Sequence, residues 1–312
     1  TCTFLKKVEV FYTSPYLNQA QTLRGVSDIF VSNERAIRIN TFNNRDSFLR
    51  NDNAQLLRRI RMNLGIDFRP GLYERHEFRI GYRDRKINSD LIPSTQNYFF
   101  DNLARQQFLS ISYRFISDRR DFQLYARSGY FLDVGISKEG LGLWKDRNAL
   151  IFDVEYSKYL PFSPKWSLEL TARGRTNLQR RTIDYYNLPV IGPKPEVVRG
   201  YITKHIRGSD FGYLKSSMRY QILDIDINLA KYMPIKAYKN IPIQIYLKLN
   251  NDLAYVRTAI DADASNNLVN RRLYGRGAGI DIVGANLALL ELMYNFNDLG
   301  ERQFDFHFYY SF

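Results

Sequence analysis

The sequence contains little cysteine and no long hydrophobic run. Its single cysteine, Cys2, excludes an intrachain disulfide and any cysteine-based zinc cluster. A cysteine at the N-terminus is the acylated residue in processed lipoproteins, but Thr1 precedes Cys2 and favours an incidental cysteine. No uninterrupted apolar run exceeds about four residues, whereas a membrane-spanning helix needs about 20. Transmembrane helices are therefore excluded.

The chain also lacks the motifs of common enzymes. His76, His205 and His307 lie far apart in sequence, and there is no GxSxG elbow and no phosphate-binding glycine loop. Their positions in the residue alternation described below direct His76 to lipid or an interface and His307 to a polar interior. We expect no enzyme, no metal and no cofactor, with an outer-membrane phospholipase as the enzymatic alternative.

The first residues carry neither a methionine start nor a leader with a charged and then an apolar segment. Such leaders are removed from exported proteins. We therefore expect a mature fragment from which any signal peptide has been cleaved.

Aromatic residues and basic charge are abundant. Phe, Trp and Tyr make up 15% of the chain, a share that favours strands and membrane girdles over a helical bundle. Lys and Arg number 45 against 32 Asp and Glu, which gives a net charge of +13. The aromatic residues alternate along strands and no localised basic patch is visible, so we expect no nucleic-acid partner. Anionic lipopolysaccharide, or acidic molecules that pass through a pore, would account for the net positive charge.

The main structural signal is a sustained alternation of apolar and polar residues. In residues 59–69, apolar side chains occupy the even positions from Ile60 to Phe68, and polar residues or glycine occupy the odd ones. Residues 76–83 repeat the pattern after a short turn, which predicts an antiparallel hairpin. Roughly fourteen segments of the chain follow this period of two. We expect low helix content.

Strand number and loop length indicate where the apolar face points. Fourteen or more strands enclose an aqueous lumen, which the polar face must line while the apolar face meets lipid. Short turns such as 117–121 alternate with long polar connections, as in outer-membrane barrels; these connections lie at 42–55, 84–105, 179–209 and 258–272. We predict an all-β fold, a transmembrane antiparallel β-barrel of about sixteen strands.

The C-terminus carries the strongest single pattern. One face of its last segment is wholly aromatic: Phe304, Phe306, Phe308, Tyr310 and Phe312. Exposed to water, such a strand would aggregate, but as the last strand of a barrel it faces lipid and has a pairing partner. The terminal phenylalanine also resembles the signal by which bacterial outer-membrane proteins are recognised for assembly.

Residues Val198, Arg199, Gly200 and Tyr201 resemble the VRG[FY] motif of the BamA/TamA-type barrels, the bacterial surface antigen family of outer-membrane assembly and translocation factors. The segments that follow occur in the family's order over about 195–312. They are LKLNNDLAYV in the place of an FFDxGxV-like strand, a GxG strand with Gly277 and Gly279, LALLELMYNF, and the aromatic closing strand.

The resemblance implies a barrel whose long inward-folded loop, here 179–209, carries VRGY at its tip. Arg199 would then meet an acid of the inner wall, and Asp252 lies on the polar face of its strand. A guanidinium and a carboxylate in a narrow lumen form a bidentate pair that pins the loop. The chain departs from the family at Arg219, where some relatives have a carboxylate, and at Ala254, where the pattern has glycine.

The resemblance also implies a weak seam between the first and last strands. The closing strand would be 301–312, with Gly300 at the turn that enters it, and nascent barrels would pair with the opened edge. Gly277 and Gly279 would let the loop approach the wall, or would be plain strand glycines. We expect one transmembrane barrel domain over residues 1–312, with the N-terminal POTRA-type domains of the family absent from this chain.

The expected function is that of a bacterial outer-membrane assembly factor or insertase, which folds and inserts other outer-membrane proteins or translocates polypeptide. The alternatives are a dedicated secretion translocator for a partner or fused domain, and a passive porin-like channel. Expected partners are outer-membrane lipid and lipopolysaccharide, nascent outer-membrane proteins or secreted polypeptide, and accessory subunits.

Overall fold

The computed structural model describes residues 5–88, 98–144, 147–179, 184–228, 240–258, 266–285 and 287–310. Cys2 and Phe312, about which the sequence makes specific predictions, lie outside these residues. Parts of three of the four long connections, 84–105, 179–209 and 258–272, also lie outside them.

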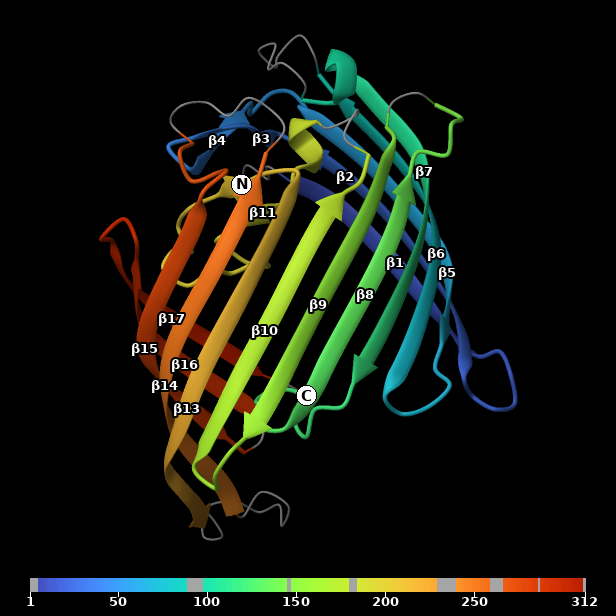
Figure 1. The fold of residues 1–312 in the computed structure, drawn as a ribbon. Helices are drawn as coiled ribbons and strands as arrows, with labels where there is room; N and C mark the ends of the chain where they lie inside the picture. The colour runs from blue at the N-terminus through green and yellow to red at the C-terminus, as the bar shows by residue number, and fades with distance from the viewer. Residues whose placement is uncertain are drawn as a thin grey trace.

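Thirteen strands of the described residues form one antiparallel sheet (Figure 1). In sheet order they are β1 (Leu5–Tyr16), β2 (Leu23–Glu34), β5 (Leu57–Phe68), β6 (Glu74–Ile87), β7 (Arg105–Asp118), β8 (Gly129–Glu139), β9 (Ala149–Pro161), β10 (Trp166–Asn177), β13 (Asp210–Asn228), β14 (Asn240–Arg257), β15 (Arg272–Gly284), β16 (Ala288–Asn297) and β17 (Arg302–Tyr310). Each strand pairs with its neighbours along the chain, as expected for a meander.

Four further strands stand apart from this sheet. β3 (Ala36–Phe42) pairs with β4 (Arg45–Arg50), and the short β11 (Val190–Ile191) pairs with β12 (Ile206–Arg207) inside the long connection after β10. Two 3-10 turns, η1 (Phe100–Asn102) and η2 (Tyr185–Asn187), complete the described elements. The expected number of about sixteen strands is close to the seventeen described in total, of which thirteen belong to the wall.

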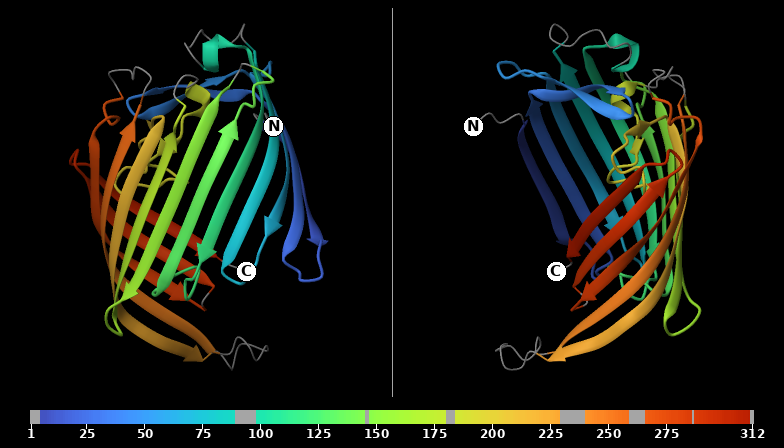
Figure 2. Two further views of the ribbon diagram at one scale, coloured as in Figure 1. Left: turned by 45° about the vertical axis from the view of Figure 1, so that its right-hand side comes forward. Right: turned by 90° about the vertical axis from the view of Figure 1, so that its left-hand side faces the viewer.

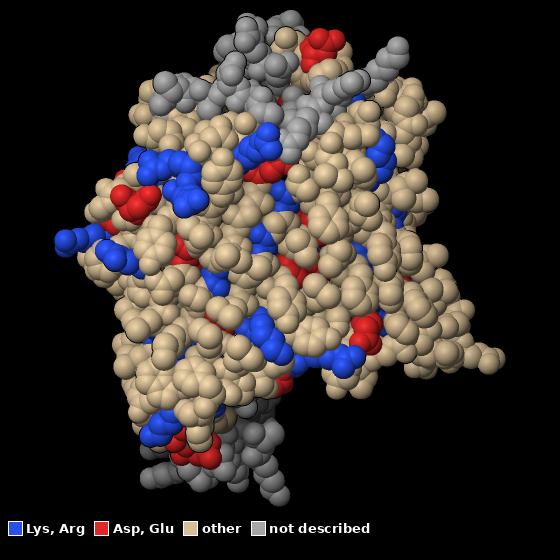
Figure 3. Space-filling model, viewed as in Figure 1, with Lys and Arg blue, Asp and Glu red and all other residues tan. Residues whose placement is uncertain are grey.

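The two faces of the wall differ in polarity as predicted. Leu64, Phe306 and Phe308 are between 58% and 67% exposed on the outer face, whereas Asp281 and Asn295 are fully buried on the inner face. Most of the surface in Figure 3 is formed by residues other than Lys, Arg, Asp and Glu. In lipid this outer surface is solvated by hydrocarbon, so its exposed apolar residues are not a defect. The alternation in the sequence thus identified the outer face correctly.

The sheet curls around an interior, which we call the lumen (Figure 2). Short connections such as 17–22 and 69–73 lie at one end, which we call the turn end, and the long connections lie at the other, the loop end. The β3–β4 hairpin lies across the loop end (Figure 1). In the described part of the chain, no helix has the length and apolarity needed to cross a membrane.

Candidate functional site

The tip of the 179–209 connection, which we call the VRGY loop, packs against the lumenal wall. Val198 and Tyr201 are fully buried in an apolar cluster built from the loop and from β13, β14 and β15. The loop side chains Ile191 and Ile206 lie in the same cluster as Ala254 and Leu273 of the wall. Burial of these side chains gives the loop apolar contacts with strands from distant parts of the sequence.

Arg199 lies against Asp252 of β14. Its Nε donates to Asp252 Oδ1 at 2.8 Å and its backbone N–H donates to Asp252 Oδ2 at 2.9 Å, while Nη2 also bonds Oδ1. The predicted geometry was a fork that uses both carboxylate oxygens. In the structure both guanidinium contacts converge on one oxygen, because the other binds the backbone of the same arginine.

The remaining guanidinium hydrogens of Arg199 bind wall residues of β13 and β14 close to Asp252. Nη1 donates to Ser217 Oγ at 2.7 Å and to Asn250 Oδ1, and Nη2 donates to the Ser216 carbonyl at 3.3 Å. A guanidinium has five N–H donors, and all five therefore have acceptors. An ammonium has only three donors and could not make these contacts.

Glycine allows the loop to approach the wall at two positions. A Cβ added to Gly275 of β15 would collide with the carbonyl oxygen of Arg199. Gly200 has φ +84°, which favours glycine, and a Cβ there would collide with the Phe296 carbonyl. The sequence singled out Gly277 and Gly279 for this purpose, but added Cβ atoms there would meet the neighbouring strand β16.

Further contacts tie the loop to other elements. Tyr201 Oη donates to Asp298 and Lys204 Nζ lies 2.7 Å from Glu301 Oε1, both in the turn between β16 and β17. This hydrogen bond from Lys204 lowers the pKa of Glu301. In the loop itself, Glu196 lies 2.9 Å from Arg173 of β10 and accepts a 3.0 Å hydrogen bond from Tyr213 of β13.

The β3–β4 hairpin contacts the other side of the VRGY loop. Arg207 Nε donates to Asp46 Oδ1 at 3.0 Å, and the backbone N–H of His205 donates to the Asn44 carbonyl at 2.7 Å. Arg207 is buried, and the side chain of Asp46 is only 7% exposed. The loop is thus held between the wall and a hairpin that covers the loop end.

A second segment, the 119–128 connection between β7 and β8, also enters the lumen. The sequence predicted a short turn at 117–121; instead β7 continues to Asp118 and the connection folds inward to the opposite wall. Tyr125 Oη donates to Asp281 of β15 at 2.9 Å, and the Ala126 carbonyl accepts a 2.7 Å hydrogen bond from Arg219 of β13. We call residues 119–128 the inward turn.

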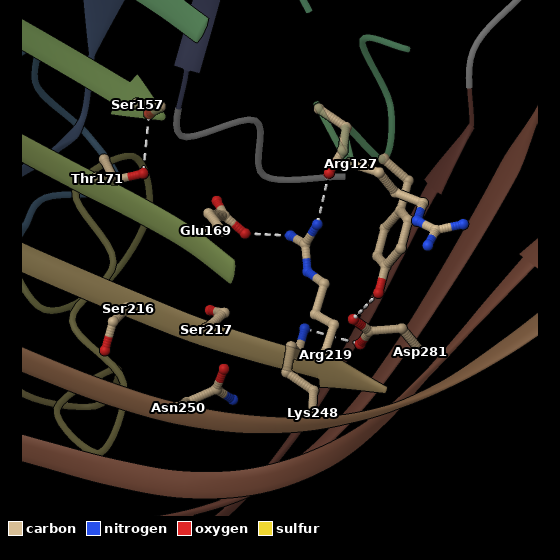
Figure 4. Close-up of polar contacts among 12 residues, drawn as sticks. Arg127, Ser157, Glu169, Thr171, Ser216, Ser217, Arg219, Lys248, Asn250 and Asp281 are labelled. Carbon is tan, nitrogen blue, oxygen red and sulfur yellow. Dashed lines mark hydrogen bonds and ion pairs between the residues drawn. The ribbon is translucent and has the colours of Figure 1, made fainter. Parts of the chain in front are cut away.

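Arg219 holds the inward turn from the wall. Figure 4 shows its guanidinium between Glu169 of β10 and the inward turn. The Arg219 guanidinium also lies 4.3 Å from the centroid of the Tyr125 ring, and that ring packs 4.9 Å from the ring of Tyr246. Arg219 therefore has a partner of its own and does not compete with Arg199 for Asp252.

A cavity of about 420 Å³ lies between the VRGY loop and the inward turn. Its lining includes Arg199 from the loop, Tyr125 from the inward turn, and Lys248 and Glu291 from the wall. The lumen is thus occupied at two levels with a polar chamber between them.

The predicted closing strand lies at one margin of the sheet. Phe304, Phe306, Phe308 and Tyr310 are at least half exposed on its outer face, and Gly300 has φ +78° in the preceding turn. Within the described residues no strand pairing joins β17 to β1, and the two strands form opposite margins of the sheet (Figure 2).

The histidines occupy three separate environments. His76 faces outward and its Nδ1 lies 2.9 Å from Tyr113 Oη, whereas His205 lies 3.7 Å from Asp46 in the loop region. His307 lines the chamber beside Tyr309. No cluster of three metal-binding side chains occurs among the residues that the structure describes.

Several residues of the site had no distinctive sequence signal. Ser217, Asn250 and Gly275 share inward parity with Asp252, and that alternation could have included them as candidates. Glu196 and the inward turn are loop residues without a period. Their positions depend on contacts between distant parts of the chain.

The wall, its inner polar face and the loop held in the lumen define an outer-membrane barrel with an inward-folded loop. Residues 5–308 match the Omp85 superfamily domain, and the chain belongs to this superfamily. It is an outer-membrane protein. No curated protein sequence matches the chain.

Solved structures at low sequence identity share the fold of this chain. BamA from Haemophilus ducreyi lacking POTRA domains 1–3 has a TM-score of 0.64 and 12% identity over 97% of this chain. CdiB from Escherichia coli has a TM-score of 0.56 and 11% identity over 98% of this chain. CdiB from Acinetobacter baumannii has a TM-score of 0.52 and 12% identity over 97% of this chain. The chain spans 61%, 52% and 49% of these three structures, respectively.

Proposed function

We propose that this barrel acts as an outer-membrane insertase, which assembles other outer-membrane proteins, with residues 1–312 as one barrel domain. The observation that carries the proposal is the VRGY loop inside the lumen, with Arg199 bonded to Asp252. A loop held there obstructs free diffusion, which argues against a passive porin. Covalent chemistry has no part in the proposed activity.

Strand pairing supplies the proposed mechanism. β1 and β17 are the two margins of the sheet in the described residues, so their outer backbone groups can pair with an incoming strand. The aromatic outer face of β17 would lie in lipid while its edge serves as the template. Nascent outer-membrane proteins are the proposed substrates, and accessory subunits and lipopolysaccharide are proposed partners.

A dedicated secretion translocator is the second candidate. The similarity in fold to the two CdiB structures favours it, as does the inner wall, whose paired charges Arg173–Glu155 and Arg114–Asp133 suit passage of a polar chain. In this mechanism the VRGY loop and the inward turn must both leave the lumen. An insertase that works at its edge does not require this.

The two functions can be separated in proteoliposomes that contain the full-length protein. An insertase should accelerate the folding of an added, urea-denatured outer-membrane barrel, measured by its resistance to protease. A translocator should instead leave barrel folding in the liposomes at the background rate, and in a separate experiment in cells it should move a co-expressed polypeptide to the outside. Folding at the rate seen in empty liposomes would contradict the proposed insertase.

The seam gives a further prediction. One cysteine placed in β1 and one in β17, with Cys2 replaced by serine, should form a disulfide that joins the two margins. Barrel-folding activity should then fall to the background rate and return on reduction, because the edge can no longer admit a new strand. Each single-cysteine variant is the control. Full activity of a verified cross-linked barrel would disprove a role for the seam.

A further inference from the structure

A row of basic residues crosses the outer face at the loop end of β1, β2, β5, β6 and β7. The strand register pairs Lys6 with Asn33, Asn33 with Arg58, Arg58 with Lys86, and Lys86 with Arg105. Four of five adjacent positions are therefore cationic. The sequence shows no localised basic patch, because each residue comes from a different strand.

The row lies just beyond the apolar band of the wall. Along β5, Arg58 is followed on the same face by Ile60, Met62 and Leu64, and Met62 and Leu64 are exposed. Along β6, Tyr82 lies on the outer face below Lys86, and its ring packs 6.0 Å from that of Trp144. Tyr and Trp side chains concentrate at the level of lipid headgroups. The row is therefore at the membrane surface.

Two cations of this row, Arg58 and Lys86, are not balanced by the protein. Side chains directly opposite each other on paired strands have Cβ atoms about 5 Å apart, and like charges in such positions repel. Arg105 binds Asp84 through Nε at 2.8 Å and Nη2 at 2.9 Å. Within the described residues, the exposed side chains of Arg58 and Lys86 make no ion pair or hydrogen bond.

The lumenal face of the same strands differs in this respect. Arg59 pairs with Glu34 and Arg61 with Asp28 on the inner face. Arg83 and Arg85 of β6 have no ion pair among the described residues, but Arg83 donates to two backbone carbonyls and Arg85 donates to Gln106 and Asn187. Exposed cations that lack both an ion pair and a hydrogen bond are therefore found in the outer row.

We propose that Arg58 and Lys86, flanked by Lys6, bind the phosphate group of an anionic lipid of the surrounding membrane. A phosphate between the two strands would accept charge-assisted hydrogen bonds from both side chains and remove their mutual repulsion. The apolar band below would contact the acyl chains of the same lipid. This proposal is independent of whether the barrel is an insertase or a translocator.

The test uses the full-length protein in a neutral detergent, titrated with lipid A as the phosphate-bearing lipid and with phosphatidylcholine as the zwitterionic one. Bound lipid is measured by native mass spectrometry, and the thermal unfolding midpoint is measured in the same samples. We expect lipid A to bind and to raise the midpoint. R58Q/K86Q should weaken lipid A binding about tenfold, because both phosphate donors are lost.

R69Q/K165Q is the matched control, since it removes the same charge from connections at the turn end. It should bind lipid A as the unchanged protein does. Without lipid, R58Q/K86Q should unfold at the same or a higher temperature, because the repulsion is gone, which separates lost binding from misfolding. Inorganic phosphate at equal concentration should not compete. Equal lipid A binding by R58Q/K86Q, or an equal loss in R69Q/K165Q, would overturn the proposal.

Discussion

Replacing Arg199 with alanine should release the VRGY loop from the lumen and abolish most of the barrel's activity. The change removes five hydrogen bonds and leaves Asp252, which is 1% exposed, without its guanidinium partner. Breaking a buried ion pair in this way costs about 3 to 5 kcal/mol. Ordering the loop backbone costs about 1 to 2 kcal/mol per residue, so the loop depends on such anchors.

The released loop can be detected by limited trypsin digestion of the protein in liposomes, since the loop contains Arg207, a trypsin site that R199A and the control below both retain. Arg199→Lys should rescue poorly, because an ammonium has too few donors for the acceptors present. Lys204→Ala is the control: it lies in the same loop and loses one cation, but its partner Glu301 is 45% exposed. That change should cost less than about 1 kcal/mol.

A double-mutant cycle distinguishes the pair from unrelated effects. Asp252→Asn should also free the loop. R199A/D252N should release the loop and lose activity no more than either single change does, because the two residues act on one contact. Additive losses in the double variant, or an intact loop in R199A, would show that Arg199 does not hold the loop.

Removal of the inward turn should open the lumen once the VRGY loop is also released. The variant replaces residues 120–127 with Asn-Gly, a sequence that favours a tight hairpin between β7 and β8. Because the two segments obstruct the lumen at different levels, the Asn-Gly variant and R199A should each raise the conductance of a planar bilayer modestly. A variant that carries both changes should raise the conductance by more than the sum of the two single effects.

Arg219→Ala tests the anchor of the inward turn without shortening the chain. It removes the hydrogen bond to Ala126 and the contact with the Tyr125 ring, so its conductance should resemble that of the shortened variant. Arg114→Ala is a control on the inner wall, because its ion-pair partner is Asp133 of β8, which lies outside both the inward turn and the VRGY loop. Equal conductance of R199A with and without the inward turn would mean that the turn does not obstruct the lumen.

Local sequence alone specifies which face of each strand meets lipid. In a strand successive side chains point to opposite faces, so the alternation around Leu64 and Phe306 assigns those residues without knowledge of the neighbours. The same parity placed Asp252 on the inner wall, and the VRGY resemblance supplied Arg199. These predictions needed only local geometry and one motif.

The tertiary structure decided which residues from different strands meet. Ser217 and Asn250 bind Arg199 because β13 and β14 pair in one register, and Gly275 faces the Arg199 carbonyl because β15 follows in the next. The inward turn and the row from Lys6 to Arg105 likewise join residues far apart in the chain. Strand register and loop path depend on the sum of many non-local contacts, which no short stretch of sequence contains.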